Sequence, residues 1–137
     1  MIENISPTEA WKVLQSDPNT IILDVRSQME FKYVGHPHDA INVPWKEPST
    51  REAEPYFVDK VKQTLRHCGL GTTTEEHKIL SLCRSGARSK LAGELLLANG
   101  FKHVLNISKG FEGDKNENKQ RNCINGWCFH GLPWEQS

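Results

Sequence analysis

The chain has 137 residues, which is enough for one compact domain and too few for two ordinary ones. Its 36% of hydrophobic and 25% of charged residues are typical of globular proteins and exclude a disordered or membrane-embedded chain. Lysine plus arginine and aspartate plus glutamate both number 17, so no overall charge favours nucleic acid or an anionic membrane as a partner.

The N-terminus indicates the cellular compartment of the protein, and the compartment limits the roles of its cysteines. Residues 1–4 lack the basic and apolar regions of a signal peptide, and no apolar run is long enough to span a bilayer. We therefore expect a cytoplasmic protein with a single domain over residues 1–137. Disulfides are rare in a reducing compartment, so each cysteine is a packing residue, a metal ligand or a nucleophile. The four cysteines are Cys68, Cys83, Cys123 and Cys128.

The first half of the chain alternates helical and strand patterns. Ser6 can cap a helix, and the Glu9 carboxylate can accept a hydrogen bond from the Ser6 amide. A continuous β-branched run then indicates a strand that is buried on both faces. In chain order, the patterns predict a helix from residue 7, a strand over 20–25, a short helix over 28–33, a short strand over 40–44, a polar loop over 46–52 and a helix over 53–66.

The second half continues this alternation. The patterns predict a strand over 78–82, a helix over 87–98, a strand over 103–107 and a hydrophilic surface loop over 113–122. One apolar stripe runs along the predicted helix and comprises Ala87, Leu91, Leu95 and Ala98. Strands that alternate with helices predict an α/β fold with a parallel sheet covered on both faces. In such sheets, ligands bind beyond the carboxyl ends of the strands.

Cys83 occupies such a position, between a strand and the helix that follows. The loop amides and the helix dipole direct partial positive charge toward it, and Arg84 and Arg88 add two full charges. These features stabilise a thiolate over a thiol and make Cys83 a candidate nucleophile. Gly86 allows a tight turn that a Cβ would obstruct. A cysteine that only packs in the core is the alternative, and the arginines, the glycine and the helix weigh against it.

The loop Cys83–Arg88, with arginine five positions after cysteine, resembles the active-site loop of the rhodanese family. Three further stretches resemble that family, and they occur in the family's order through nearly the whole chain. These stretches are Leu23–Arg26 with Glu30 and Phe31, Gly35 and His36 with Ala40–Pro44, and Gly110–Gly113 with Gly126, Trp127 and Gly131–Pro133.

The resemblance implies a rhodanese-like α/β fold, a three-layer sandwich in which a five-stranded parallel sheet has helices on both faces. It also implies a sulfurtransferase that carries sulfur as a persulfide on Cys83. The Cys83 thiolate would take the outer sulfur of a small anionic donor such as thiosulfate and release sulfite. Cyanide, a cellular thiol or a protein sulfur acceptor would then take the sulfur from the persulfide.

For this chemistry we also expect distinct roles within the loop. The loop amides would hold the persulfide anion, and they belong to Arg84, Ser85, Gly86, Ala87 and Arg88. The Arg84 side chain would attract the anionic donor. The Arg88 side chain would point beneath the loop and brace it against a carboxylate, for which Asp24 and Glu30 are the supporting candidates.

Two stretches depart from the family pattern. His38–Asp39 stands where small residues are more common, and the polar insert Asp114–Arg121 separates the stretch at Phe111 from Gly126 and Trp127. Both lie away from the catalytic loop in the sequence. We therefore expect them to affect recognition of the acceptor more than the chemistry.

Other functions compete with sulfur transfer to a small acceptor. A cysteine-loop phosphatase or arsenate reductase has one more residue between cysteine and arginine, whereas Arg88 is the fifth residue after Cys83 and position 89 is serine. A non-catalytic rhodanese-like binding module often lacks the cysteine that this loop retains. Relay of the persulfide to a partner protein uses the same chemistry and stays open.

The remaining candidate ligands are weaker. The spacing of Cys123 and Cys128 is wider than in most zinc sites, and a resolving-thiol role stays open for them. His36 and His38 have no third ligand nearby in the sequence. We therefore expect no metal and no cofactor.

Overall fold

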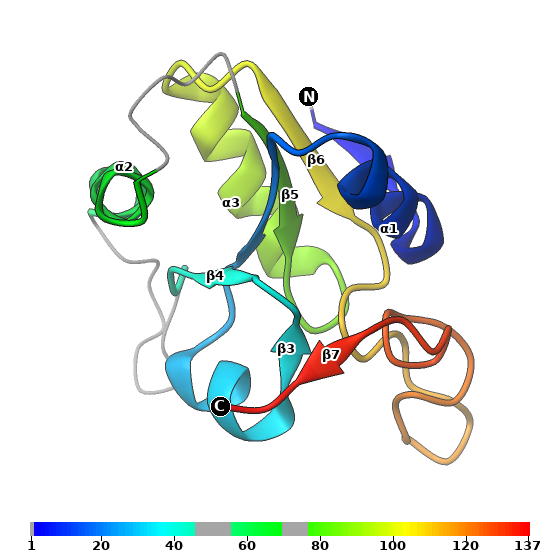
Figure 1. Ribbon diagram of the computed structural model, residues 1–137. Helices are drawn as coiled ribbons and strands as arrows, with labels where there is room; N and C mark the ends of the chain where they lie inside the picture. The colour runs from blue at the N-terminus through cyan, green and yellow to red at the C-terminus, as the bar shows by residue number, and fades with distance from the viewer. Residues whose placement is uncertain (1, 46–55, 70–76) are drawn as a thin grey trace.

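A computed structural model of the chain describes residues 2–45, 56–69 and 77–137 (Figure 1). The polar loop predicted over 46–52 and the first residues of the helix predicted over 53–66 lie outside these ranges. Within the described part of the chain, no helix is long and apolar enough to cross a membrane.

Five strands form one sheet in the order β1-β6-β5-β2-β4, and all neighbouring strands are parallel. This arrangement confirms the predicted fold class. The register aligns Asp24 with Leu82 and Ser81 with Asn106, so the carboxyl ends of the three central strands meet at one edge of the sheet. The strands are β1 (Glu3–Ile5), β2 (Thr20–Asp24), β4 (Ile41–Asn42), β5 (Lys78–Leu82) and β6 (His103–Ile107).

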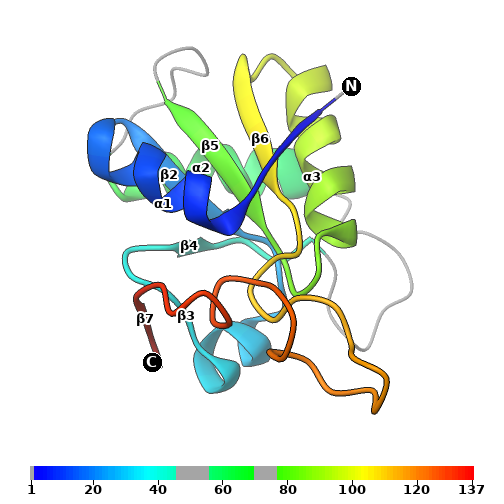
Figure 2. The same ribbon diagram turned by 90° about the vertical axis from the view of Figure 1, so that its right-hand side faces the viewer.

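Helices cover both faces of the sheet. The helix α1 (Pro7–Ser16) lies on one face, and α2 (Phe57–His67) and α3 (Ala87–Ala98) lie on the other (Figures 1 and 2). On the α2 and α3 side, a buried cluster includes Ile21, Leu23, Val61, Leu65, Ile79, Ala92, Leu96 and Val104. On the α1 side, a second buried cluster comprises Ala10, Ile22, Leu80, Leu82, Ile107, Phe111 and Trp127.

The start of α1 follows its predicted cap in part. The Ser6 hydroxyl oxygen accepts a hydrogen bond from the Glu9 amide at 3.2 Å. The Glu9 carboxylate does not return to the Ser6 amide as predicted; it accepts a 2.9 Å hydrogen bond from the Ser6 hydroxyl. Both contacts fix the first turn of the helix, and Pro7 at the first position loses no hydrogen bond there.

Several elements differ from their predicted form. Residues Glu3–Ile5 form a short strand, β1, that was not predicted. Three residues are too few to show a strand pattern in the sequence. The helix predicted over 28–33 is a π-helical turn, η1 (Glu30–Val34). The strand predicted over 40–44 is the two-residue strand β4.

The buried face of α3 is not the apolar stripe of its sequence. All four residues of that stripe are exposed: Ala87, Leu91, Leu95 and Ala98. The buried residues are small, except for the leucine: Ser89, Ala92, Gly93 and Leu96. A Cβ at Gly93 would overlap the Ile2 side chain, so the helix packs closely against the sheet. Close approach between helix and sheet, rather than hydrophobicity alone, therefore selects the buried face.

The C-terminus adds a strand pair outside the main sheet. Here β7 (Trp134–Glu135) pairs antiparallel with β3 (His36–Pro37). Figure 1 shows β7 in red beside the cyan segment of β3 and η1, close to the edge where β4 ends. The strand pair joins the C-terminus to the segment that follows β2.

Candidate active site

Cys83 follows β5 directly and precedes the start of α3 by four residues. Its side chain is buried, with 1% of its surface exposed. Two donors face its sulfur: the Gly86 amide is 3.1 Å from Sγ, and the Ser89 hydroxyl oxygen is 3.2 Å from it. Both donors and the N-terminal end of the helix dipole stabilise negative charge on the sulfur.

Gly86 makes the turn between Cys83 and the helix. Its φ of 111° lies in a region that favours glycine. A Cβ at this position would also lie 3.3 Å from the Lys109 amide nitrogen, which is a tight contact with backbone. The glycine predicted from the sequence is therefore required both by the turn and by its neighbour.

The segment after β6 holds the loop from the other side. The Phe111 amide donates to the Cys83 carbonyl at 2.8 Å, and the Glu112 amide donates to the Arg84 carbonyl at 2.9 Å. Gly110 has a φ of 60°, and a Cβ there would overlap both of these carbonyl groups. The stretch at Gly110, which the family resemblance singles out, thus fixes the backbone around Cys83.

Arg88 forms a bidentate ion pair with Glu30, with N–O distances of 2.8 and 3.0 Å. The Ser27 amide and hydroxyl both donate to the same carboxylate at 3.2 Å. Burial raises the pKa of Glu30, but Arg88, the Ser27 backbone and the more distant Arg26 outweigh it and lower the pKa to about 2. The hydrogen bonds that Arg88 donates to Glu30 raise the pKa of Arg88, against the effect of burial. The pair is therefore fully ionised at neutral pH.

Asp24 holds a different arginine. Its carboxylate lies 2.6 Å from Arg26 Nη2, and both side chains are completely buried. The same Nη2 donates to the Gly35 carbonyl at 2.6 Å, and the guanidinium lies 4.5 Å from the centre of the Phe111 ring. Of the two carboxylates predicted to brace Arg88, Glu30 makes the contact, and Asp24 pairs with Arg26.

The outer part of the loop faces solvent. The Arg84 and Ala87 side chains are exposed, and Ser85 and Gly86 are half-buried. Arg84, next to the buried Cys83, therefore presents a guanidinium group to solvent.

Two buried residues beside the sulfur are not among the predicted site residues. The Ser89 hydroxyl lies 2.5 Å from Asn106 Oδ1 as well as 3.2 Å from Cys83 Sγ. Asn106 Nδ2 donates to the Gly86 carbonyl at 3.2 Å and to Asn4 Oδ1 at 2.9 Å. The Gly86 carbonyl lies 3.2 Å from the same Ser89 hydroxyl. One hydroxyl proton thus has three acceptors in reach, and it can turn toward the sulfur when that atom is charged.

The sequence carried a signal for one of these residues. Asn106 lies within a short buried strand, where asparagine is depleted. A buried amide side chain needs hydrogen-bond partners, and the nearest site in the fold is the Cys83 loop. The sequence signal for Ser89 is weaker, since the direction of its side chain depends on where the helix starts.

The other cysteines have different environments. All four cysteines are free thiols, and Cys68 and Cys123 are exposed. Burial and the charge of Glu112 raise the pKa of Cys128 to about 11, although Arg26 lowers it in part. Cys128 is therefore protonated at neutral pH and is a poor resolving nucleophile.

Both stretches that depart from the family pattern, His38–Asp39 and Asp114–Arg121, contain residues that contact other parts of the chain. In the insert, Asp114 pairs with Lys109 at 3.0 Å, and Arg121 donates to the Gly113 carbonyl at 2.6 Å. His38 lies 3.3 Å from Glu135 in β7. Among the described residues, no group of three or more histidine, cysteine, aspartate or glutamate side chains is arranged to hold a metal ion.

A family sequence model described as the rhodanese-like domain matches residues 6–117. The chain belongs to the rhodanese-like family. The uncharacterized protein RC0915 of Rickettsia conorii is 32% identical to this rhodanese-like chain over 139 residues, which cover 98% of each protein. The tRNA uridine(34) hydroxylase of Yersinia enterocolitica is 33% identical over 94 residues, which cover 69% of this chain and 23% of the hydroxylase.

Solved structures agree with the family assignment. Rv0390 from M. tuberculosis superposes with a TM-score of 0.80 at 30% identity, and the match covers 98% of each chain. The polysulfide-sulfur transferase homodimer of Wolinella succinogenes superposes with a TM-score of 0.63 at 25% identity, covering 99% of this chain and 80% of that one. Both comparisons extend the likeness beyond the residues matched by the family.

Proposed function

We propose that this chain is a single rhodanese domain over residues 1–137 that transfers sulfur through a persulfide on Cys83. The observation that carries the proposal is the buried Cys83 sulfur at the start of α3, which accepts hydrogen bonds from the Gly86 amide and the Ser89 hydroxyl. The likeness to a polysulfide-sulfur transferase supports sulfur transfer as the class of reaction.

The donor in this proposal is thiosulfate or a similar small anion. The Cys83 thiolate attacks the outer sulfur, a new S–S bond forms, and the bond between the two thiosulfate sulfur atoms breaks. Sulfite leaves with the electron pair of that bond. The negative charge then lies on the outer persulfide sulfur, where the amides of residues 84–88 can stabilise it. Arg84, exposed beside the loop, attracts the donor.

The second step returns the enzyme to its starting state. A nucleophile, either cyanide or a thiolate, attacks the outer sulfur of the persulfide. The S–S bond breaks, and its electron pair regenerates the Cys83 thiolate. The product is thiocyanate or the persulfide of the acceptor. An acceptor thiol on a small molecule and one on a partner protein react in the same way.

The supporting residues act on the shape of the loop. The Glu30–Arg88 pair braces the start of α3, and the Asp24–Arg26 pair lies buried beneath the Phe111 segment. The chemistry needs no metal and no cofactor. We propose a cytoplasmic setting, because a reducing compartment keeps the four free thiols available.

Intact mass spectrometry tests the proposal directly. Incubation with thiosulfate should add the mass of one sulfur atom to the protein, and subsequent cyanide should remove it and yield thiocyanate. Cys83→Ser should lose both the adduct and the product, because serine does not form a persulfide. Cys123→Ser, which changes an exposed thiol, should behave like the wild type. Normal turnover by Cys83→Ser would contradict the assignment of the persulfide to Cys83.

A further inference from the structure

Residues 134–137, called the C-terminal strap below, lie along β3 and η1 (Figure 1). Within the strap, β7 pairs antiparallel with β3. Beyond this strand pair, the Gln136 side chain donates to the Tyr33 carbonyl at 2.7 Å, and the Ser137 amide donates to the Lys32 carbonyl at 3.3 Å. The strap therefore holds both β3 and the turn η1.

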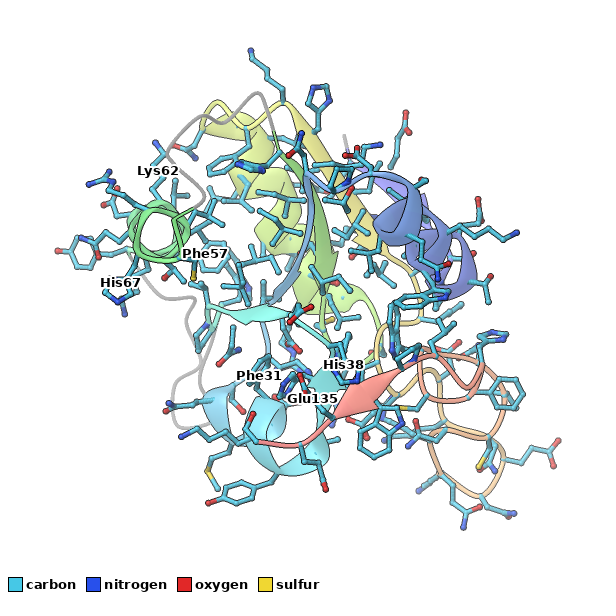
Figure 3. The ribbon with its side chains drawn as sticks, in the orientation of Figure 1. Phe31, His38, Phe57, Lys62, His67 and Glu135 are labelled. Carbon is cyan, nitrogen blue, oxygen red and sulfur yellow. The ribbon has the colours of Figure 1, made fainter. Side chains whose placement is uncertain are left out.

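The Glu135 side chain contacts two histidines, and one of them, His36, joins the strap to η1. Its Oε1 lies 3.3 Å from His38 Nδ1 and 3.6 Å from His36 Nε2. The other ring nitrogen of His36 lies 2.9 Å from the Phe31 carbonyl oxygen, and the two rings stack with centroids 3.7 Å apart. Figure 3 shows Glu135, His38 and Phe31 gathered in this region. These contacts reach the residue next to Glu30.

The Trp134 side chain makes a second connection toward the catalytic loop. A Cβ at Gly35 would lie 2.7 Å from the Trp134 ring, so the ring packs directly on the backbone after η1. The same ring meets Phe111 edge-on, with centroids 6.1 Å apart. The Phe111 amide is the group that donates to the Cys83 carbonyl. The strap thus touches both segments that support the nucleophile.

We propose that the C-terminal strap positions the Cys83 loop, chiefly by holding η1 so that Glu30 stays paired with Arg88. The proposal deepens the proposed function, since it rests on that function for what the loop does. Trp134 and Glu135 would be positioning residues, because they act on the loop through other side chains.

The strap is attached locally, which separates its role from that of the core. Neither of the two buried clusters of described residues includes a strap residue, and Trp134 is 45% exposed. Removal of the strap should therefore loosen η1 without unfolding the sheet. Glu30 would then leave Arg88 for part of the time, and the loop amides would lose their fixed geometry around the sulfur.

Amide hydrogen exchange on a chain that ends at Pro133 tests this. The variant keeps the 2.9 Å hydrogen bond from Trp127 to the Pro133 carbonyl, so the preceding segment stays anchored. Amides of residues 84–89, which lie outside the strap's own contacts, should exchange about two- to thirtyfold faster, whereas those of β5 and β6 should not change. Faster exchange confined to residues 30–38 would overturn the proposal.

A second change identifies the route. In the Glu30→Gln variant, the pair with Arg88 is already weakened. Truncation of this variant should therefore accelerate amide exchange in the loop by less than truncation of the wild type does. Equal acceleration in both backgrounds would overturn the route through Glu30. Sulfur transfer gives a parallel readout: the truncation should lower kcat for thiosulfate and leave KM unchanged, since the exposed Arg84 side chain keeps its charge.

Glu135→Gln keeps the proposal testable if the truncated chain fails to fold. It removes one charge beside the two histidines and should accelerate loop exchange in the same direction, whereas Glu3→Gln, a matched change on the exposed strand β1, should not. Unchanged exchange in folded Glu135→Gln would overturn the proposal. Exchange requires no sulfur donor, so a chain that forms no persulfide but shows these shifts would contradict only the proposed function.

Discussion

At the scale of single residues, two arginines in one loop have different surroundings. The Arg84 side chain is exposed, whereas both terminal nitrogens of Arg88 bind the Glu30 carboxylate. An exposed guanidinium is available for a ligand. A guanidinium already paired in a bidentate way is held in one geometry and contributes to the shape of the site.

Replacement of each arginine by alanine should therefore have a different effect. Arg84→Ala should raise KM for thiosulfate about 10- to 100-fold, the loss of one charge-assisted contact. Arg88→Ala should lower the free energy of unfolding by about 1–3 kcal/mol, because it leaves the Glu30 carboxylate without its main partner. Steady-state kinetics and urea denaturation measure the two effects. Identical changes in both variants would show that the division of roles is wrong.

At the scale of elements, we expect the width of the Cys83 loop to determine which group fits beside the sulfur. Four residues separate Cys83 from Arg88, and the Gly86 amide is already 3.1 Å from Sγ. Donors must lie within about 2.7–3.1 Å of an anion to stabilise it. A ring closed this tightly suits one added sulfur atom and crowds a tetrahedral group.

Insertion of one residue between Ser85 and Gly86 tests whether the loop width selects sulfur transfer over phosphate hydrolysis. The wider ring should form less persulfide from thiosulfate, because its amides no longer converge on a single sulfur atom. The wild type should not hydrolyse a small aryl phosphate at neutral pH. Mass spectrometry and a phosphatase assay give the two readouts. Robust phosphatase activity in the wild type, lost in Cys83→Ser, would replace sulfur transfer as the proposed function.

At the scale of the whole molecule, the Glu30–Arg88 pair links segments 58 residues apart in the sequence. The pKa of Glu30 is lowered from 4.5 to about 2 in the folded chain. A lowered pKa stabilises the fold above the unfolded value of 4.5, and this contribution is lost as the pH falls toward 2.

Stability should therefore fall on acidification in a way that depends on Glu30. After allowance for partial exposure of the pair, we expect Glu30 to account for about 1–2 kcal/mol of the loss between neutral pH and about pH 2. Glu30→Gln should be less stable at neutral pH and should lose less stability in acid. Denaturant unfolding across this range measures both slopes, with Glu3→Gln as the control. Parallel slopes for wild type and Glu30→Gln would contradict the assignment.

The sequence by itself determined the fold class and the position of Cys83. Buried strands such as 20–25 and 78–82 appear as largely apolar runs, and the caps and glycines that bound the helices are local signals. The loop from Cys83 to Arg88 is also local, because strand end, tight turn and helix start follow one another in the chain. Short-range sterics and hydrogen bonding suffice to specify such features.

Only the tertiary structure decided which distant residues meet. It paired Arg88 with Glu30 and Asp24 with Arg26, brought Asn106 to Ser89 beside the sulfur, and turned the apolar stripe of α3 to solvent. It also joined the C-terminal residues to β3. Each outcome depends on how closely the helices and loops pack on the sheet, and this packing selects among partners that no local pattern distinguishes.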